Sequence, residues 1–262
     1  MNVMEMLSLR GKTAVVTGGA GRYGRQIVAG LAEAGAEVYI ASRNQEKCEA
    51  VAAEFRADGG DVKAVALDLA DQNSIDAMVD GVIRSAGKID ILVNNAVTRC
   101  VGGGWGSPLS AYDQSLHVNA SAMFYITSLV AGDMKKRNRG SIINIGSMMG
   151  LVGIERGNYR GTEMGRNPSP IYFYEKGGVV NFTRWAASIL GPHNIRVNAV
   201  HPGGLMEAHL PEAFVRNYSE RTQLGRLAGP EDLKGVIVFL ASDASGYVTG
   251  TNIPVDGGYT AK

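Results

Sequence analysis

The chain has 262 residues, a formal net charge of +1, 45% hydrophobic and 19% charged residues. This balance is ordinary for a globular protein and excludes a disordered chain or a strongly basic nucleic-acid-binding protein. No apolar run is long enough to cross a membrane, and the N-terminal residues lack the features of a signal peptide. Cys48 and Cys100 stand in no metal or redox spacing, so we expect free thiols, no metal site and a cytoplasmic location without nucleic-acid or membrane partners.

Short β-branched runs alternate with longer helical patterns along the whole chain. The expected strands cover residues 12–18, 37–42, 62–68, 89–95, 140–146, 195–202 and 251–258. The expected helices cover residues 22–34, 44–58, 71–86, 110–137, 171–190 and 230–241. Start signals for three of these helices are Asp71, Ser110 with Asp113, and Pro230. Because the strands are apolar nearly throughout and alternate with helices, the sequence predicts one α/β domain over 1–262, a doubly wound, mostly parallel sheet of about seven strands.

Two segments do not fit this alternation. Residues 148–170 follow the fifth expected strand and residues 203–222 follow the sixth. Ligands of doubly wound folds bind beyond the carboxyl ends of the strands. We therefore expect both segments to be loops on the substrate side of the molecule.

The first expected strand leads directly into the stretch TGGAGRYG and then into a helix. Gly19, Gly21 and Gly24 satisfy the pattern G-x-G-x-x-G, which lets backbone N–H groups approach a pyrophosphate at the helix N-terminus. A strand-to-helix turn without any ligand is the alternative. Placed after the first strand of an alternating chain, the pattern favours a dinucleotide site.

The end of the second expected strand, YIASRN, bears on which dinucleotide binds. An NAD site usually places an acid there, whereas this chain has Ser42 and Arg43. A hydroxyl and a guanidinium suit a 2′-phosphate, and Arg22 in the glycine turn adds a second charge. NADP(H) is therefore favoured over NAD(H), with a solvated surface role for Arg43 as the alternative.

The stretch SPIYFYEKGG raises the question of catalysis. If it is helical, Tyr172 and Lys176 share a face and Tyr174 points elsewhere, toward an interface or the core. An ammonium about 4 Å from a phenolate stabilises it by roughly 4 kcal/mol at an effective dielectric of 20, or about three pK units. The spacing therefore indicates a phenol that can exchange a proton near neutral pH.

The chain closely resembles the short-chain dehydrogenase/reductase family over nearly its whole length. The resemblance rests on TGGAGRYG, LDLAD, NNA, HVNA, IGS, YFYEK, NIRVNAVHPGG, GRLAGPEDL and YVTGTNIPVDGG, in that order. It implies a Rossmann fold and NAD(P)-dependent hydride transfer between a nicotinamide cofactor and a secondary alcohol or ketone. The implied catalytic residues are Asn119, Ser147, Tyr172 and Lys176. The implied cofactor site comprises Gly18, Gly21, Arg22, Tyr23, Gly24, Ser42, Arg43, Asp68, Leu69, Asn95, Ala96, Pro202 and Gly203, together with Tyr172 and Lys176.

The sequence departs from the family pattern at several positions. Val97 replaces the glycine usual after NNA, and PGGLME lacks the threonine that often follows PG. Ser147 and Tyr172 are also about a dozen residues further apart than is usual. The extra residues lie in segment 148–170, which resembles an inserted loop of members that act on sugars and sugar acids, such as gluconate 5-dehydrogenase-like members.

Several polar residues are candidates for substrate binding. Arg156, Arg160 and Arg166 suit a carboxylate or phosphate, and Trp105 offers a stacking face for a sugar ring. A solvated loop whose arginines pair with its own glutamates is the alternative.

Other readings of the whole chain stay open. A 3-oxoacyl thioester is the rival substrate to a sugar, sugar acid or polyol, and a non-catalytic nucleotide-binding regulator is the rival function. For His201 we expect packing or a hydrogen bond. The resemblance further implies a homotetramer built on the helices at 110–137 and 171–190 and on the C-terminal strand region from residue 251 to 262. The helix at 171–190 has more apolar surface than one sheet face needs, from Phe182, Trp185, Ala186, Ile189 and Leu190.

Overall fold

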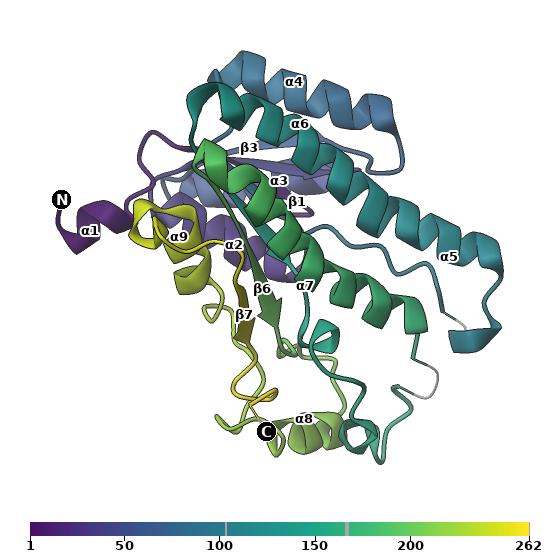
Figure 1. Cartoon of the computed structure of the whole chain (residues 1–262). Coiled ribbons are helices and arrows are strands. Elements are labelled where there is room, and N and C mark those ends of the chain that lie inside the picture. Colours follow the sequence, from purple (N-terminus) through teal and green to yellow (C-terminus); the bar gives the residue numbers. More distant parts are fainter. Residues whose placement is uncertain (103, 166–167, 262) are drawn as a thin grey trace.

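A seven-stranded sheet forms the centre of the molecule (Figure 1). The computed structural model of the protein describes residues 1–102, 104–165 and 168–261. The strands are β1 (Thr13–Thr17), β2 (Glu37–Ser42), β3 (Asp61–Ala66), β4 (Ile91–Asn94), β5 (Gly140–Ile145), β6 (Ile195–Pro202) and β7 (Asn252–Val255). Their order is β3-β2-β1-β4-β5-β6-β7, and every neighbouring pair is parallel. The predicted doubly wound α/β fold is confirmed, and the sheet is parallel throughout rather than mostly parallel.

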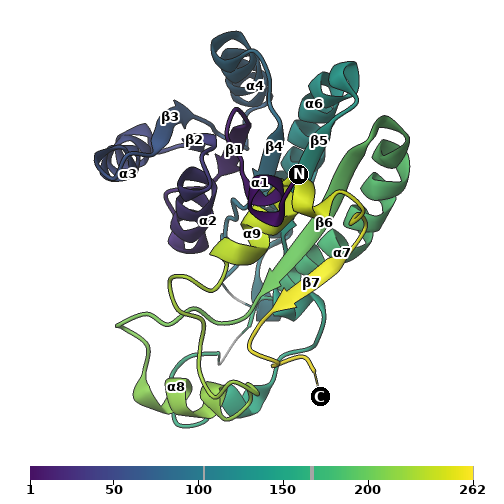
Figure 2. The same ribbon diagram turned by 90° about the vertical axis from the view of Figure 1, so that its left-hand side faces the viewer.

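Helices cover both faces of this sheet. The α-helices of the described chain are α1 (Val3–Leu7), α2 (Arg22–Glu33), α3 (Gln45–Ala57), α4 (Gln72–Ala86), α5 (Leu109–Leu116), α6 (Ala122–Arg137), α7 (Pro170–Leu190), α8 (Glu212–Ser219) and α9 (Lys234–Ala241). Figure 2 shows α2 and α9 on one side of the sheet and α4, α6 and α7 on the other. Each face has its own core because successive strand residues point to opposite sides: Val16 belongs to the core under α2 and α9, and Val15 to the core under α4, α6 and α7.

A buried ladder of amides links the two central strands to the helices. Asn94 of β4 is paired in register with Asn144 of β5, and its Nδ2 donates to Asn144 Oδ1 at 2.9 Å. Asn94 Nδ2 also donates to Thr127 Oγ1, and Asn144 Nδ2 donates to Thr183 Oγ1, both at 3.0 Å. Because buried amides without partners are costly, this ladder fixes the register of β4 against β5.

The helix predicted over 110–137 is present without a break from Leu109 to Arg137, but it is not α-helical throughout. It begins at Leu109 after Pro108, so Ser110 does not cap it, and a π-helical turn, η2 (His117–Ser121), separates α5 from α6. Such turns widen the helix and re-aim a side chain. Here the turn contains Asn119, whose amide bonds to the chain after β4.

Two further helix predictions need correction, whereas one start signal is confirmed. Asp71 caps α4 by accepting from the Asn73 N–H. The last predicted helix begins at Lys234 instead of Pro230, because Asp232 binds the Gly229 N–H and the Arg226 guanidinium and so holds 230–233 in a turn. Segment 203–222, expected to be a loop, contains α8.

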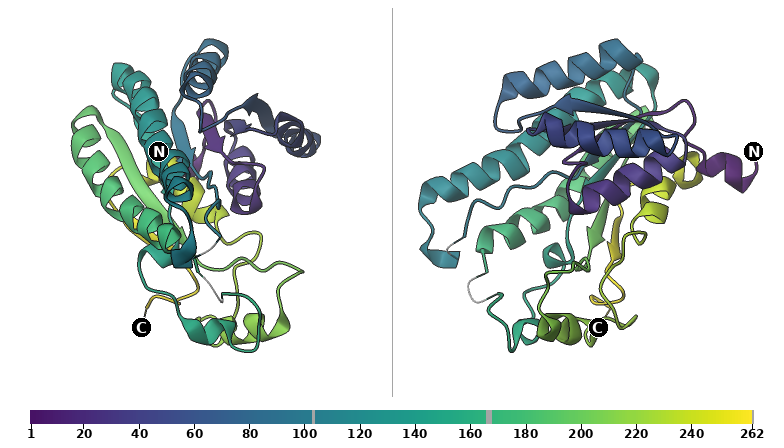
Figure 3. Two further views of the ribbon diagram at one scale, coloured as in Figure 1. Left: turned by 90° about the vertical axis from the view of Figure 1, so that its right-hand side faces the viewer. Right: turned by 180° about the vertical axis from the view of Figure 1, so that it is seen from behind.

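The segments 148–165 and 203–228 pack against each other below the sheet, and we call this region the outer lobe (Figure 3). Its small core contains Met148, Phe214, Tyr218 and Leu227, with Tyr259 from the C-terminal end of the chain. Short helical turns η3 (Met148–Gly150) and η4 (Arg156–Tyr159) lie in its first segment. In the part of the chain that the structure describes, no helix is both long and apolar enough to cross a membrane.

Candidate active site

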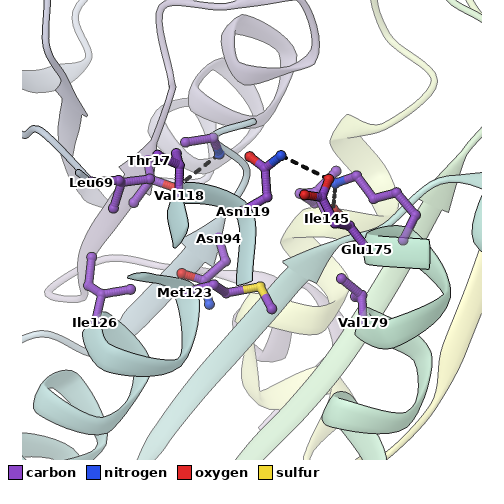
Figure 4. Close-up of a pocket in the computed structure, with 12 residues that line it drawn as sticks. Thr17, Leu69, Asn94, Val118, Asn119, Met123, Ile126, Ile145, Glu175 and Val179 are labelled. Atoms are coloured by element: carbon purple, nitrogen blue, oxygen red, sulfur yellow. Dashed lines mark hydrogen bonds between the residues drawn. The ribbon is translucent and has the colours of Figure 1, made fainter. Parts of the chain in front are cut away.

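The predicted site residues gather at the carboxyl ends of β1, β4, β5 and β6. There a small cavity of about 20 Å³ opens among Thr17, Asn94, Asn119, Glu175 and Lys176 (Figure 4). A space of roughly 10–15 Å³ is enough for one water molecule. The cavity is therefore large enough for a single water between polar groups from β1, β4, η2 and α7.

The glycine turn has the shape that a dinucleotide requires. Gly18 N donates to Ala41 O at 2.7 Å, which ties the turn to β2. A Cβ at Gly24 would stand 2.3 Å from Gly18 O, so the close approach of turn and helix requires glycine there. Gly21 is the N-cap of α2, and no side chain caps its first N–H groups. These free donors at a helix N-terminus fit the pyrophosphate of NAD(P).

The residues expected to choose between the two dinucleotides lie at the end of β2. The Ser42 hydroxyl lies 2.9 Å from the thiol of Cys48, which is buried and free. Arg43 is exposed and forms no ion pair with any described residue. Arg22 turns away from β2 and pairs with Glu207 of the outer lobe at 3.0 Å.

Asp68 and Leu69 follow β3 on the β2 side of the glycine turn, whereas Asn95 and Ala96 follow β4 on its other side. Asp68 is half-buried and caps its own turn by accepting from the Ala70 N–H, and Leu69 lines the cavity. Asn95 Nδ2 donates to Thr17 O and Gly18 O at 2.9 and 3.0 Å, and Ala96 N donates to Thr17 Oγ1. Asn95 thus braces the glycine turn.

The chain after β6 closes the site from the other edge. Pro202 ends β6, and Gly203 O accepts a 2.8 Å hydrogen bond from the Tyr23 hydroxyl at the start of α2. Burial raises the pKa of Tyr23, so this hydroxyl stays a donor. The contact joins the glycine turn to the loop that leads into the outer lobe.

Ser147 follows β5 and is 8% exposed. Its main chain contacts the fully buried His201, whose Nδ1 lies 3.3 Å from Ser147 N, while Nε2 lies 2.8 Å from Asn252 Oδ1. The hydrogen-bonding role expected for His201 is therefore confirmed. A Cβ at Gly150 would meet Lys176 O at 2.3 Å, so the turn after Ser147 lies directly against α7.

Tyr172 and Lys176 share one face of α7, and Tyr174 points away with 72% of its surface exposed. A core role for Tyr174 is therefore wrong. Lys176 Nζ lies 5.9 Å from the Tyr172 ring centroid and donates to Ile145 O at 2.7 Å. Burial lowers the pKa of Lys176 to about 8, with the nearby Glu175 opposing this shift and Arg99 adding to it.

Asn119 is fixed by four hydrogen bonds. Its Oδ1 accepts from Thr98 N at 2.8 Å, and its Nδ2 donates to Thr98 O at 2.9 Å. Nδ2 also donates to Ser115 Oγ and, at 2.9 Å, to Glu175 Oε2. The π turn therefore directs this amide toward α7 and the loop after β4.

Comparison with known proteins identifies the family. Residues 23–260 match the family model described as enoyl-(acyl carrier protein) reductase. The chain is 34% identical to a 3-oxoacyl-[acyl-carrier-protein] reductase of Thermotoga maritima, over 96% of this chain and 99% of that protein. It is also 34% identical to gluconate 5-dehydrogenase of Gluconobacter oxydans, over 100% of both chains.

The chain belongs to the short-chain dehydrogenase/reductase family. A solved gluconate 5-dehydrogenase from Burkholderia cenocepacia, in complex with NADP and tartrate, superposes with a TM-score of 0.87 at 30% identity, covering 100% of each chain. This dehydrogenase is accordingly an NAD(P)-dependent oxidoreductase that acts on alcohol or ketone groups.

Two side chains of the dehydrogenase contact the site without having been predicted. Arg99, in the loop after β4, places its Cζ 5.0 Å from the Tyr172 ring centroid. Glu175, immediately before Lys176, is 7% exposed and binds Asn119. Arg99 follows a strand at the binding edge, and Glu175 lies three residues after Tyr172 on the helix, so position alone could have indicated both.

The predicted substrate residues of the dehydrogenase lie at its surface. Trp105 is 89% exposed, and Arg156 and Arg160 are exposed without an ion pair to any described residue. Arg166 lies outside the described residues. Glu155 pairs with Arg221 of the second lobe segment at 3.0 Å rather than with an arginine of its own loop. Tyr159 of the same loop is half-buried and lies close enough to Tyr172 and Arg99 to interact with them electrostatically.

Proposed function

We propose that this enzyme reversibly oxidises a secondary alcohol of a small hydroxylated anion, such as a sugar acid, with NADP(H) as its cofactor. The observation that carries the proposal is the Arg99 guanidinium, 5.0 Å from the centre of the Tyr172 ring. Arg99 forms no ion pair with any described residue, so its charge is free for a substrate carboxylate or phosphate next to the reacting hydroxyl.

Four side chains divide the proton chemistry. Tyr172 takes the hydroxyl proton in oxidation and returns one in reduction, because it can reach the substrate oxygen from α7. Lys176 stabilises the phenolate and would bind the ribose of the cofactor. Ser147, held by His201, binds the substrate oxygen, and Asn119 holds a water next to Lys176. The nicotinamide, when bound, accepts or returns the hydride.

The preference for NADP(H) rests on the end of β2. Ser42, Arg43 and Asn44 stand where an NAD site usually carries an acid, and the exposed Arg43 is free of ion pairs among the described residues. The solved relative that binds NADP supports the same cofactor. NAD(H) is the alternative, because Ser42 already contacts Cys48.

A sugar acid is favoured by the relatives as well as by Arg99. One relative is a gluconate 5-dehydrogenase, and the solved relative holds tartrate, a hydroxylated diacid. Arg156, Arg160 and Trp105 stay predictions as further substrate contacts. The second candidate is a 3-oxoacyl thioester, which the similarity to the Thermotoga maritima reductase supports.

We also propose that the enzyme is a homotetramer that uses the outer faces of α6 and α7. Phe124 of α6 and Trp185 and Ile189 of α7 are 47%, 60% and 49% exposed. Phe182 bridges them, with its ring centroid 4.6 Å from Phe124 and 6.0 Å from Trp185. Such a contiguous aromatic surface is typical of an interface. A monomeric mass by light scattering at micromolar concentration would contradict this.

The test compares a sugar acid with the polyol of the same carbon skeleton and with a 3-oxoacyl thioester, each with both cofactors. Arg99→Ala should lower kcat/KM for the acid about tenfold or more, since a charged hydrogen bond contributes about 1.5–3 kcal/mol, and should change the polyol rate little. Arg84→Ala, an exposed arginine at the end of α4, is the control. The proposal fails if Arg99→Ala leaves the acid-to-polyol ratio unchanged or if the thioester is by far the best substrate.

A further inference from the structure

Glu175 is a buried carboxylate that the chemistry described above does not use. It is 7% exposed, its Oε1 accepts from Ser115 Oγ at 2.6 Å, and its Oε2 accepts from Asn119 Nδ2 at 2.9 Å. It forms no ion pair with any described residue within 4.0 Å. A buried carboxylate is costly without hydrogen bonds or a counter-charge, so two neutral donors alone leave its charge uncompensated.

A charge of the opposite sign is buried next to it. Lys176 is 8% exposed, and its one hydrogen-bond acceptor in the described structure is the main-chain Ile145 O. Glu175 and Lys176 line the same small cavity (Figure 4), which has room for one water molecule. The carboxylate of Glu175 and the ammonium of Lys176 are therefore two opposite buried charges at one cavity, where each can compensate the other.

We propose that Glu175 is a positioning residue of the dehydrogenase: its carboxylate orients the Asn119 amide and serves, across the cavity, as the counter-ion that keeps Lys176 protonated. This inference rests on the proposed roles of Tyr172, Lys176 and Asn119. Burial works against the ammonium, and its loss would remove the cation that stabilises the phenolate. Alcohol oxidation releases a proton and is favoured at alkaline pH, where this loss would matter most.

The other described groups around Lys176 do not supply the negative charge that we assign to Glu175. The titratable or charged groups that face it in the described structure are Tyr172 on α7 and Arg99 in the loop after β4. Tyr23 on α2 and Tyr159 on η4 lie one step further away, close to Tyr172. Arg99 repels the Lys176 ammonium, and a tyrosine with a protonated hydroxyl supplies no negative charge to it. Among the described groups around Lys176, Glu175 is the carboxylate, and it is therefore the group that can serve as the counter-ion.

The test is the pH profile of kcat/KM for alcohol oxidation, measured from about pH 6 to about pH 10. Glu175→Gln should move the alkaline limb down by about one pH unit or more, because a unit charge a few ångströms away shifts a pKa by at least this much. Glu175→Asp keeps the charge and should restore the position of the limb even where the maximal rate is lower. Asp133→Asn, which removes a similarly buried carboxylate paired with Arg137, should lower stability without moving the limb.

Three outcomes overturn the inference. One is an unmoved limb in Glu175→Gln, including a uniform loss of activity at every pH, which a purely structural role would give. Another is a limb that moves equally in Asp133→Asn. If Glu175→Gln does not fold, Ser115→Ala replaces it. Loss of the Ser115 donor favours the protonated Glu175 carboxyl, so the activity of this variant must fall selectively at acidic pH. The third outcome that overturns the inference is an unchanged pH profile in Ser115→Ala. Tyr172→Phe in the same assay separates the two proposals, because an active Tyr172→Phe enzyme refutes the proposed function itself.

Discussion

The sheet and the outer lobe are held together by different interactions. The sheet has continuous main-chain ladders and two apolar cores. In the described part of the lobe, the main-chain pairing outside local turns consists of the short bridge between Leu205 and Ala228 with its flanking bonds. Single bonds from Gly203 N to Val255 O and from Leu224 N to Gly257 O join the lobe to the chain at β7 and beyond. The lobe depends instead on packed aromatic rings, with the ring centroids of Tyr159 and Phe214 5.5 Å apart, and on the hydrogen bond that Asn158 Nδ2 donates to the Tyr259 hydroxyl.

We infer from this difference that the sheet side carries the proposed chemistry and that the lobe influences which substrate binds. Ser147, Lys176 and Asn119, which we propose for the chemistry, lie at the end of β5 or on helices packed against the sheet, where hydrogen bonds hold them. Tyr172 stands on the same face of α7 as Lys176. The lobe has a small core of its own, so we expect its loops to be able to change without disturbing the residues proposed for catalysis.

The largest effect on activity should come from replacing a residue proposed for catalysis on the sheet side. Tyr172→Phe should lower kcat by about a hundredfold to ten-thousandfold, since the variant lacks the group that exchanges the proton, while cofactor affinity stays nearly the same. Tyr174→Phe is the matched control on the exposed face and should keep most of the activity. Steady-state kinetics of both purified variants decide it: a more damaging Tyr174→Phe would reverse our assignment.

Loosening the lobe should act on binding more than on chemistry. Phe214→Ala removes the central ring of the lobe, a change that costs about 3–5 kcal/mol at a buried site. KM for the best substrate should rise about tenfold, and hydrogen exchange should speed up in 148–165 and 203–228 but not in the strands. Leu224→Ala, at a site 68% exposed in the same lobe, is the control. Uniformly faster exchange in the sheet would show that the two regions unfold together.

The proposed cofactor preference rests on Ser42 and Arg43 at the end of β2, outside the lobe, and should be insensitive to loosening of the lobe core. Arg43→Ala should lower the affinity for NADP(H) about tenfold, because it removes a charged contact to the 2′-phosphate, and should leave NAD(H) affinity unchanged. Titration of both cofactors into wild type, Arg43→Ala and Phe214→Ala measures this. Tighter binding of NAD(H) by the wild type would refute the assignment.

The smallest effect concerns the ion pair at the base of the lobe. The hydrogen bond from Arg226 lowers the pKa of Asp232 to about 2, although burial opposes it. The stability that this pair adds is present above about pH 4 and is lost as the pH falls through about 2. Because Arg226 is half-exposed, Asp232→Asn should cost only about 1 kcal/mol at neutral pH and almost nothing at pH 2. Urea unfolding of both proteins at the two pH values tests it.

The same contrast explains what could be predicted from the sequence. The apolar strands and the glycine turn gave the sheet, and the spacing of Tyr172 and Lys176 placed both on one face of a helix. The lobe was harder because its helix α8 has a proline before it and no capping side chain, although the spacing of Leu210, Phe214 and Tyr218 is helical. The position of Arg99 after β4 could have indicated a place near the site, but its contact with the Tyr172 ring joins residues distant in sequence, and no local pattern predicts that contact.

The hydrogen-bonded amides of β4 and β5 limit how far the residues of the candidate site can be displaced. Asn94 and Asn144 pair in register, and the chain reaches Asn95 one residue later and Ser147 three residues later. A slip of one residue would shift a strand by about 3.3 Å and turn its side chains to the other face, whereas a misplacement of about 1 Å already impairs a reaction. If β4 and β5 paired one residue out of register, the buried amides could not form these hydrogen bonds. The register that the amides require is therefore also the register that aligns the residues of the candidate site.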